Sequence, residues 1–157
     1  MNFWSTITGK LLTTFAVAMV PVIELRGAIP FGMAQGLSLW SAVIASILGN
    51  ILPVPFIVLF IRRIFAWMRQ HMPRLNGLVT RLEQKAERNK EKVLKYEFWG
   101  LFLLVAIPLP GTGAWTGSLV AALMDLRLKK AFPAIALGVI AAGVIVTLIT
   151  YGAVLVL

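Results

Sequence analysis

The fourteen residues GLSLWSAVIASILG, at positions 36–49, return at positions 125–138 as DLRLKKAFPAIALG. The two copies align without gaps and share six residues, and Gly49 and Gly138 close the alignment. Each copy leads into a long apolar run, and each follows an apolar segment that proline and glycine interrupt. This repeat predicts a chain with two similar halves.

Two of the apolar runs are long enough to cross a bilayer. Trp40–Ile61 and Ala131–Tyr151 carry no charge, and a crossing helix needs about 20 residues. Of the 157 residues, 59% are hydrophobic and 13% are charged, whereas a soluble domain has about 25% charged residues. A soluble protein of this composition could not cover its surface with polar side chains. The sequence therefore predicts an all-α integral membrane protein.

The two segments Leu11–Leu39 and Phe98–Met124 are apolar but contain several prolines and glycines. Proline inside a helix removes a backbone donor and clashes with the preceding turn. Non-helical backbone at membrane depth is tolerated only inside protein or beside a wet cavity. Neither segment is therefore expected to be one straight helix. We expect each to be a re-entrant helical hairpin that enters and leaves the membrane on the same side, and the alternative is a conventional four-span protein in which both segments cross.

The net charge of +9 is concentrated in two loops. Residues 62–97 hold ten of the fifteen Lys and Arg together with four Glu, and Asp125–Lys130 adds three cations and one acid. Cytoplasmic loops of membrane proteins carry such an excess, so both loops are predicted to be cytoplasmic. The first contains an amphipathic pattern typical of a basic helix in solvent or beside anionic lipid headgroups. Because nucleic acid would need a basic face on a folded domain, we expect no nucleic-acid partner.

These patterns predict one membrane domain, residues 1–157, built from two inverted repeats. Residues 1–61 would form a hairpin and a transmembrane helix, 62–97 a basic cytoplasmic linker helix, and 98–157 a second hairpin and transmembrane helix. The hairpins would then enter from opposite faces and meet near the midplane, as in transporters with inverted repeats. Both termini would lie outside the cytoplasm. We expect a homodimer, because two crossing helices and two hairpins are too few to enclose a transport pathway.

Glu24 and Arg26 are the only charges between Leu11 and Ile61. A charge at the bilayer centre costs roughly 2.5–3.5 kcal/mol, so such residues usually pair or line a path. The two residues could form a substrate or proton site, or a structural pair that fixes the hairpin. The residues that would shape this hairpin are Pro21, Gly27, Pro30 and Gly32.

The second interrupted segment carries IPLPGTGAWTG at positions 107–117, with two hydroxyls and no charge. Its glycines could expose backbone N–H groups that hold an anion at the start of a half-helix. Alternatively, they could let helices approach closely, as GxxxG motifs do. The candidate residues here are Pro108, Pro110, Gly111, Thr112, Gly113, Thr116 and Gly117.

The composition also bears on chemistry. The chain has no cysteine and one histidine, and it offers no metal-ligand set, nucleophile–base pair or carboxylate pair. We therefore expect no enzymatic activity and no metal or other cofactor. The leading hypothesis is a proton-coupled transporter of an amphiphilic substrate, in which Arg26 attracts an anionic headgroup and Glu24 carries the proton. The alternatives are an exporter in which Glu24 holds a cationic drug, and a membrane-organising protein that transports nothing.

The motif ELRGAIP, followed about 80 residues later by PLPGTGAWTG, resembles the small multi-drug export protein family, a prokaryotic branch of the DedA-like membrane protein superfamily. The resemblance covers nearly the whole chain. It implies a multi-pass protein of the prokaryotic cytoplasmic (inner) membrane with two opposed re-entrant hairpins. Members of the superfamily are associated with moving lipid carrier phosphates such as undecaprenyl phosphate, and with the proton motive force. By position, the matching residues are Glu24, Arg26, Gly27, Pro30, Pro108, Pro110, Gly111, Thr112 and Gly113.

Overall fold

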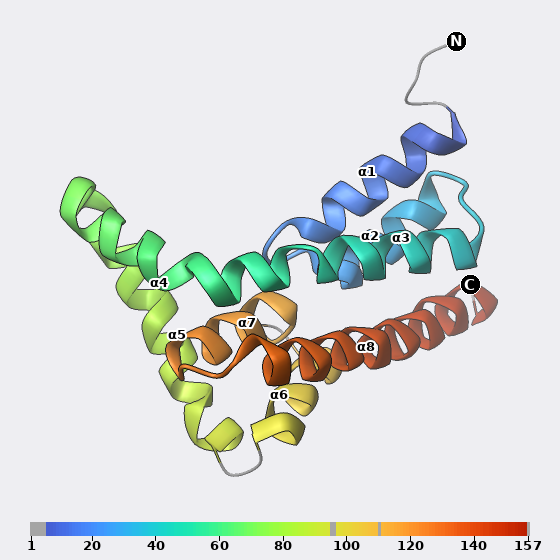
Figure 1. Cartoon of the computed structure of the whole chain (residues 1–157). Helices are drawn as coiled ribbons and strands as arrows, with labels where there is room; N and C mark the ends of the chain where they lie inside the picture. The colour runs from blue at the N-terminus through green and yellow to red at the C-terminus, as the bar shows by residue number, and fades with distance from the viewer. Residues whose placement is uncertain (1–5, 95–96, 110, 157) are drawn as a thin grey trace.

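The computed structural model describes residues 6–94, 97–109 and 111–156, and every regular element in them is helical (Figure 1). The prediction of an all-α protein is thereby confirmed. In chain order the elements are α1 (Ile7–Met19), α2 (Glu24–Ala34), α3 (Leu39–Ile51), α4 (Pro53–His71), a short 3-10 turn η2 (Pro73–Leu75), α5 (Asn76–Leu94), α6 (Glu97–Ala106), α7 (Ala114–Leu123) and α8 (Leu128–Val156).

Two helical stretches are long and apolar enough to cross a membrane. They cover Leu39–His71, with 33 residues, and Leu128–Gly152, with 25 residues. The first joins α3 and α4 through a single turn residue, Leu52. Helix α4 runs past Ile61 to His71 because no proline or glycine interrupts it there. The first part of the predicted linker therefore belongs to this long helix.

Large apolar side chains are exposed on the outward faces of these stretches. Ile44 and Phe56 are 56% and 59% exposed, and Leu148 on α8 is 68% exposed. Large side chains of this kind are normally withdrawn from water, and contiguous exposed apolar surface indicates contact with lipid or with another protein. The exposure is what a helix that faces hydrocarbon requires.

Both interrupted segments form pairs of short helices. The first helix pair, α1 and α2, turns at residues 20–23, where Val22 has φ +85°. In the second helix pair, α6 ends at Ala106 and α7 begins at Ala114. Pro30 lies inside α2 and does not end it, so the chain turns nearer Pro21. Proline is tolerated within membrane helices where neighbouring groups satisfy the freed carbonyl.

The two helix pairs end in the same way. Gly36 follows α2 with φ +83°, and Asp125 follows α7 with φ +55°. The N–H of the next residue then donates to a carbonyl oxygen in the last helical turn. This bond is 3.1 Å long from Leu37 to Gly32 and 2.9 Å long from Leu126 to Ala121. This is the Schellman arrangement of a helix C-terminus. Gly36 and Asp125 are also the first residues of the two aligned sequence copies.

The glycines that close the two copies perform equivalent packing roles. A Cβ on Gly49 of α3 would collide with the carbonyl oxygen of Phe15 in α1. A Cβ on Gly138 of α8 would lie 2.9 Å from the carbonyl oxygen of Phe102 in α6. In each half, therefore, the long helix lies directly against the backbone of the first short helix.

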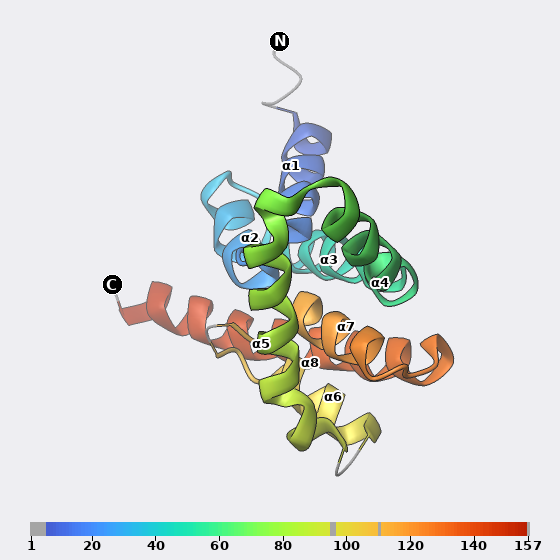
Figure 2. The same cartoon turned by 90° about the vertical axis from the view of Figure 1, so that its left-hand side faces the viewer.

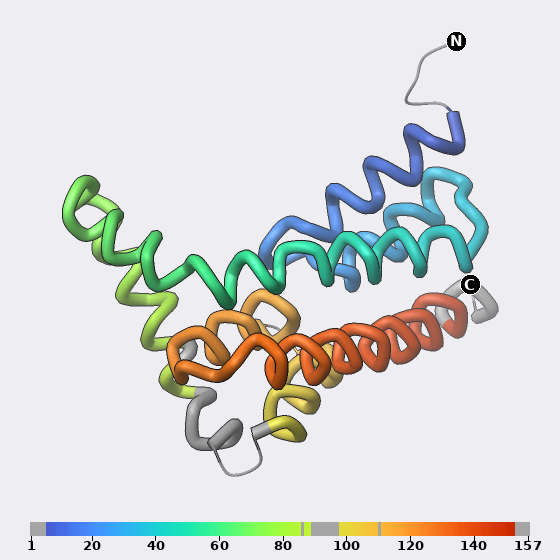
Figure 3. Tube along the Cα trace, viewed as in Figure 1, coloured from blue at the N-terminus to red at the C-terminus, as the bar shows by residue number. Residues whose placement is uncertain are grey.

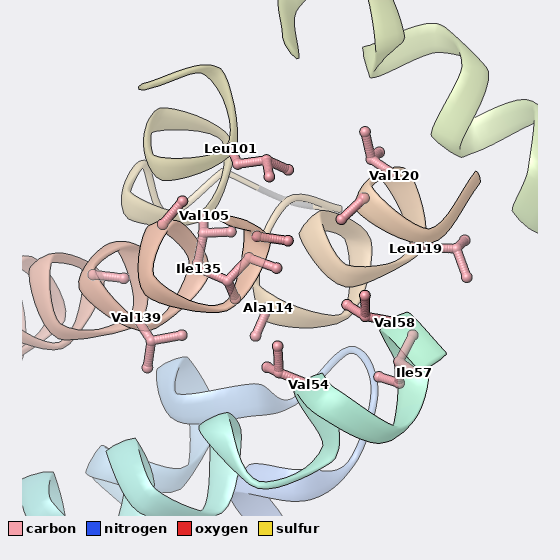
Figure 4. Close-up of a cluster of buried hydrophobic side chains, with 14 of the residues drawn as sticks. Val54, Ile57, Val58, Leu101, Val105, Ala114, Leu119, Val120, Ile135 and Val139 are labelled. Atoms are coloured by element: carbon pink, nitrogen blue, oxygen red, sulfur yellow. The ribbon is translucent and has the colours of Figure 1, made fainter. Parts of the chain in front are cut away.

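The second half contributes most of the apolar core drawn in Figure 4. Leu101 of α6 and Ile135 of α8 are at most 1% exposed, and Val54 of α4 packs into the same cluster. Helix α5 crosses this assembly (Figure 2) and buries Val79 completely. The start of α1, the α2–α3 turn and the end of the described part of α8 lie at one end of the molecule, and the α7–α8 turn lies towards the other (Figure 3).

Candidate functional site

The turns of the two helix pairs meet in the middle of the protein. The backbone N–H of Trp115, in the first turn of α7, donates to Oε1 of Glu24 at 3.2 Å. The indole Nε1–H of the same Trp115 donates to the carbonyl oxygen of Met19, at the end of α1, at 3.0 Å. The two interrupted segments of the sequence are therefore joined directly.

The Glu24 carboxylate lies at the N-terminus of α7. Glu24 is the first residue of α2, has φ +49°, and is 5% exposed. The first N–H groups of a helix have no partner within it and favour a negative charge. Gly113 precedes α7 with φ +137°, and a Cβ added to it would lie 2.7 Å from Cδ of Glu24. The absence of a side chain at Gly113 is thus what lets the carboxylate reach the helix.

Arg26 holds the turn between α6 and α7. Its Nη2 donates to the carbonyl oxygen of Thr112 at 2.8 Å and to the Thr112 hydroxyl at 3.1 Å. Its Nη1 donates to the carbonyl oxygen of Leu109. These contacts satisfy carbonyls of an irregular segment that has no helical partners for them.

Glu24 and Arg26 both form hydrogen bonds with residues of the second helix pair. In the residues that the structure describes, no ion pair of 4.0 Å or less joins their side chains. Each charge is satisfied by backbone groups from the other half of the chain. Both contacts connect the two halves of the chain.

A cavity of about 770 Å³ opens beside these contacts. Most of its wall is apolar, and its charged lining side chains are Glu24, Arg26 and Lys85. The full lining consists of Pro21, Val22, Glu24, Arg26, Ile61, Leu78, Leu82, Lys85, Pro108, Gly111, Thr112, Trp115, Thr116 and Leu119.

Lys85 is a member of the site that the sequence analysis missed. It comes from α5, and its Nζ lies 3.4 Å from the position that a Cβ on Gly111 would occupy. Among the many cations of residues 62–97 nothing marks it individually. The sequence pattern that could have identified it is its helical spacing from Leu78 and Leu82, because residues three or four apart lie on one face of a helix. Both leucines line the same cavity.

The structure divides the predicted motif residues into three groups. Five line the cavity together with Glu24 and Arg26, namely Pro21, Pro108, Gly111, Thr112 and Thr116. Gly113 lies against Glu24, while Gly27, Pro30, Gly32 and Gly117 do not line the cavity. Pro110 lies outside the described residues.

Two of these glycines act in helix packing. A Cβ on Gly117 would lie 2.6 Å from Cγ2 of Val105 on α6, and one on Gly32 would lie 2.9 Å from Cγ2 of Thr14 on α1. In the second motif, Gly117 permits the close approach of α6 and α7. The N-terminus of α7 also binds an anionic group. That anion is the protein's own carboxylate.

Comparison with known proteins identifies the family. A family described as "Putative small multi-drug export protein" matches residues 24–145, from the start of α2 to well inside α8. No curated protein and no solved structure matches the chain. Among the described residues no three His, Cys, Asp or Glu side chains gather where they could hold a metal. The match covers more than half of the chain and agrees with its two long apolar helices, so this membrane protein belongs to the small multi-drug export protein family.

Proposed function

We propose that the protein is a secondary transporter for an amphiphilic molecule with an anionic headgroup, and that the cavity between the two helix pairs is its binding site. The observation that supports this proposal is the composition of the cavity, whose wall is mostly apolar but contains two cations and one acid. The acid is 5% exposed, so Arg26 and Lys85 dominate the charge presented to a ligand. A volume of about 770 Å³ lies within the usual range of about 300–1,000 Å³ for small-molecule sites.

The proposed substrate has two chemically different ends. Arg26 and Lys85 would bind a phosphate, since arginine matches phosphate oxygens with its planar fork and lysine adds a point charge. Thr112 and Thr116 offer hydroxyls at the same end. The apolar wall, which includes Leu82, would receive the start of a hydrocarbon chain. A lipid carrier phosphate, the substrate class implied by the DedA-like resemblance, has this chemistry.

Transport across the prokaryotic cytoplasmic membrane would use two inverted repeats. Each helix pair would be a re-entrant hairpin, and each long helix would cross once, so that both termini lie outside. The matching caps at Gly36 and Asp125 and the matching contacts of Gly49 and Gly138 support this proposal. Reporter fusions at both termini test it, because cytoplasmic signals from both ends would contradict the arrangement.

Proton coupling would arise from competition for the same groups. The Glu24 carboxyl accepts the Trp115 N–H and shares the lining of the cavity with Arg26 and Lys85. When Glu24 takes up a proton, its attraction to the α7 N-terminus and to the two cations weakens. Those groups then become available to the phosphate of the substrate. Proton uptake and substrate binding would therefore favour each other.

A cationic drug is the second candidate substrate. The family description and the carboxylate in the cavity wall favour it, because Glu24 could attract a lipophilic cation once Arg26 moves aside. The two candidates predict opposite responses to loss of Arg26. Removing this cation should impair movement of an anion and should leave or improve movement of a cation.

Purified protein in liposomes separates these possibilities. Movement of a labelled polyprenyl phosphate and of a cationic dye would be measured with and without a pH gradient. We expect wild type to move the phosphate, Arg26→Ala and Lys85→Gln to lower the rate at least tenfold, and Arg26→Lys to recover it partly, since lysine lacks the fork.

The coupling step and the control use two further variants. Glu24→Gln should fold and bind but lose stimulation by the gradient, because it keeps the shape and removes the titratable proton. Arg81→Gln, an exposed cation of α5 outside the cavity, should behave like wild type. Dye movement that survives in Arg26→Ala would favour drug export, and movement of neither probe by stable wild-type protein would favour a membrane-organising role. We also expect a homodimer, which cross-linking in the same liposomes would detect.

A further inference from the structure

A second cavity lies apart from the first, between the beginning of α6 and the beginning of α8. Its volume is about 360 Å³, and its lining shares no residue with the cavity between the helix pairs. Five of its seven lining residues are apolar, and the other two are Lys129 and Lys130. We propose that this second cavity binds an anionic phospholipid, with its phosphate at the lysines and the start of an acyl chain against the apolar wall.

The wall is built to receive hydrocarbon. Leu101 and Ala131 are 1% and 0% exposed and form a fixed floor within the apolar core. Phe98 and Pro133 complete the sides. A soluble phosphate would gain nothing from such a surface, whereas an acyl chain is attracted by removal of its apolar area from water. The apolar wall therefore favours a lipid over a free anion.

The lysines place positive charge at the mouth of the second cavity. Both are exposed and lie in the first turn of α8, where the helix dipole adds to the attraction for an anion. Asp125, the acid that precedes them in the same loop, forms an ion pair with Arg62 of α4. That acid therefore has a cationic partner on another helix.

The other half of the protein supplies an internal comparison. In the aligned copy at residues 36–49, the positions of Lys129 and Lys130 are held by Trp40 and Ser41. Trp40 is 73% exposed, and the Ser41 hydroxyl accepts a 2.8 Å bond from Ser38. The same structural position thus carries a basic pair in one half and an uncharged pair in the other. A site for anionic headgroups is expected only where the basic pair stands.

This asymmetry matches the two faces of a membrane. In the proposed topology the α7–α8 turn is cytoplasmic, and the cytoplasmic leaflet attracts clustered Lys and Arg through its anionic lipids. Occupation of the second cavity would hold the starts of α6 and α8 together at that surface. Only the choice of leaflet depends on the proposed topology, and binding does not depend on what the larger cavity transports.

The test replaces Lys129 and Lys130 with the residue types found at the aligned positions of the other half, tryptophan and serine. Wild type and a Lys129→Trp/Lys130→Ser variant would be titrated in neutral detergent with phosphatidylglycerol and with phosphatidylcholine, and bound lipid would be counted by native mass spectrometry. We expect the variant to bind phosphatidylglycerol at least tenfold more weakly and phosphatidylcholine unchanged. An Arg81→Gln/Arg88→Gln control removes the same charge from the exposed face of α5 and should stay within twofold of wild type.

Two further measurements keep the result decisive. Lys129→Gln/Lys130→Gln removes the charge without adding an indole, so it replaces the first variant if that one elutes as aggregate. Excess glycerol phosphate should fail to displace the lipid, and displacement would mean a site for soluble phosphates instead. Wild-type affinity in the lysine variants, or an equal loss in the arginine control, would overturn the proposal in favour of non-specific attraction to basic protein.

Discussion

Gly113→Ala should destabilise the protein strongly, although it adds one methyl group. Gly113 has φ +137° and ψ −167°, a region that is essentially restricted to glycine and costs of order 1–3 kcal/mol for other residues. The new Cβ would also lie 2.7 Å from Cδ of Glu24, so the carboxylate must leave the Trp115 N–H. A lost hydrogen bond to a charged group costs about 1.5–3 kcal/mol. We therefore expect the free energy of unfolding to fall by roughly 2.5–6 kcal/mol.

Unfolding by SDS in mixed micelles, followed by tryptophan fluorescence, would measure this change. Gly77→Ala is the matched control, because a Cβ there meets nothing within 4 Å and alanine favours a helix by up to about 1 kcal/mol. In Gly113→Ala/Glu24→Ala the collision is gone, so the double variant should lose clearly less than the two single losses added together. A Gly113→Ala protein within about 0.5 kcal/mol of wild type, the usual range for neutral surface changes, would refute the proposed role of this contact.

Three smaller predictions concern other contacts. Gly49→Ala should lower the free energy of unfolding by roughly 1–3 kcal/mol, because the new Cβ collides with a backbone carbonyl that cannot move alone. Gly152→Ala, whose Cβ meets nothing within 4 Å, should be neutral in the same SDS titration. Thr112→Val removes a hydroxyl that accepts from Arg26 and should cost about 1 kcal/mol, while Thr112→Ser should remain near wild type in a thermal melt. Val79→Ala empties a fully buried position of α5 and should cost roughly 1.5–3 kcal/mol, seen as faster hydrogen exchange in that helix; unchanged exchange would mean that α5 is not docked.

Periodicity and composition predicted the features that depend on neighbouring residues. The helical class, the two long apolar stretches and the interruption of the segments before them follow from local sequence and are present. Glu24 and Arg26 stood out because a charge is conspicuous in an apolar run. The position of the first turn was less predictable: Pro30 remains inside α2, and the chain turns instead where Val22 takes a positive φ.

Contacts between distant segments could not be predicted in this way. Nothing near Gly113 in the sequence indicates that a carboxylate from α2 needs the space of its missing side chain. Lys85 belongs to a strongly basic stretch, and only the docking of α5 brings it into the cavity lining. Val79, expected on a helix in solvent or at the membrane surface, is instead fully buried. The re-entrant geometry, the inversion of the repeats and the roles of the site residues stay predictions.

The contacts of Glu24 and Arg26 also impose an order of events during synthesis. Their partners in the second helix pair lie between 83 and 91 residues further along the chain. At about 5–20 residues per second, a ribosome needs roughly 4–18 s to deliver them after the two charges have emerged. During that interval the first helix pair holds an acid and a guanidinium without their final hydrogen-bond partners. The nascent first half would therefore wait in a hydrated or chaperoned state, and a chain that stops after His71 should be a substrate for membrane proteases.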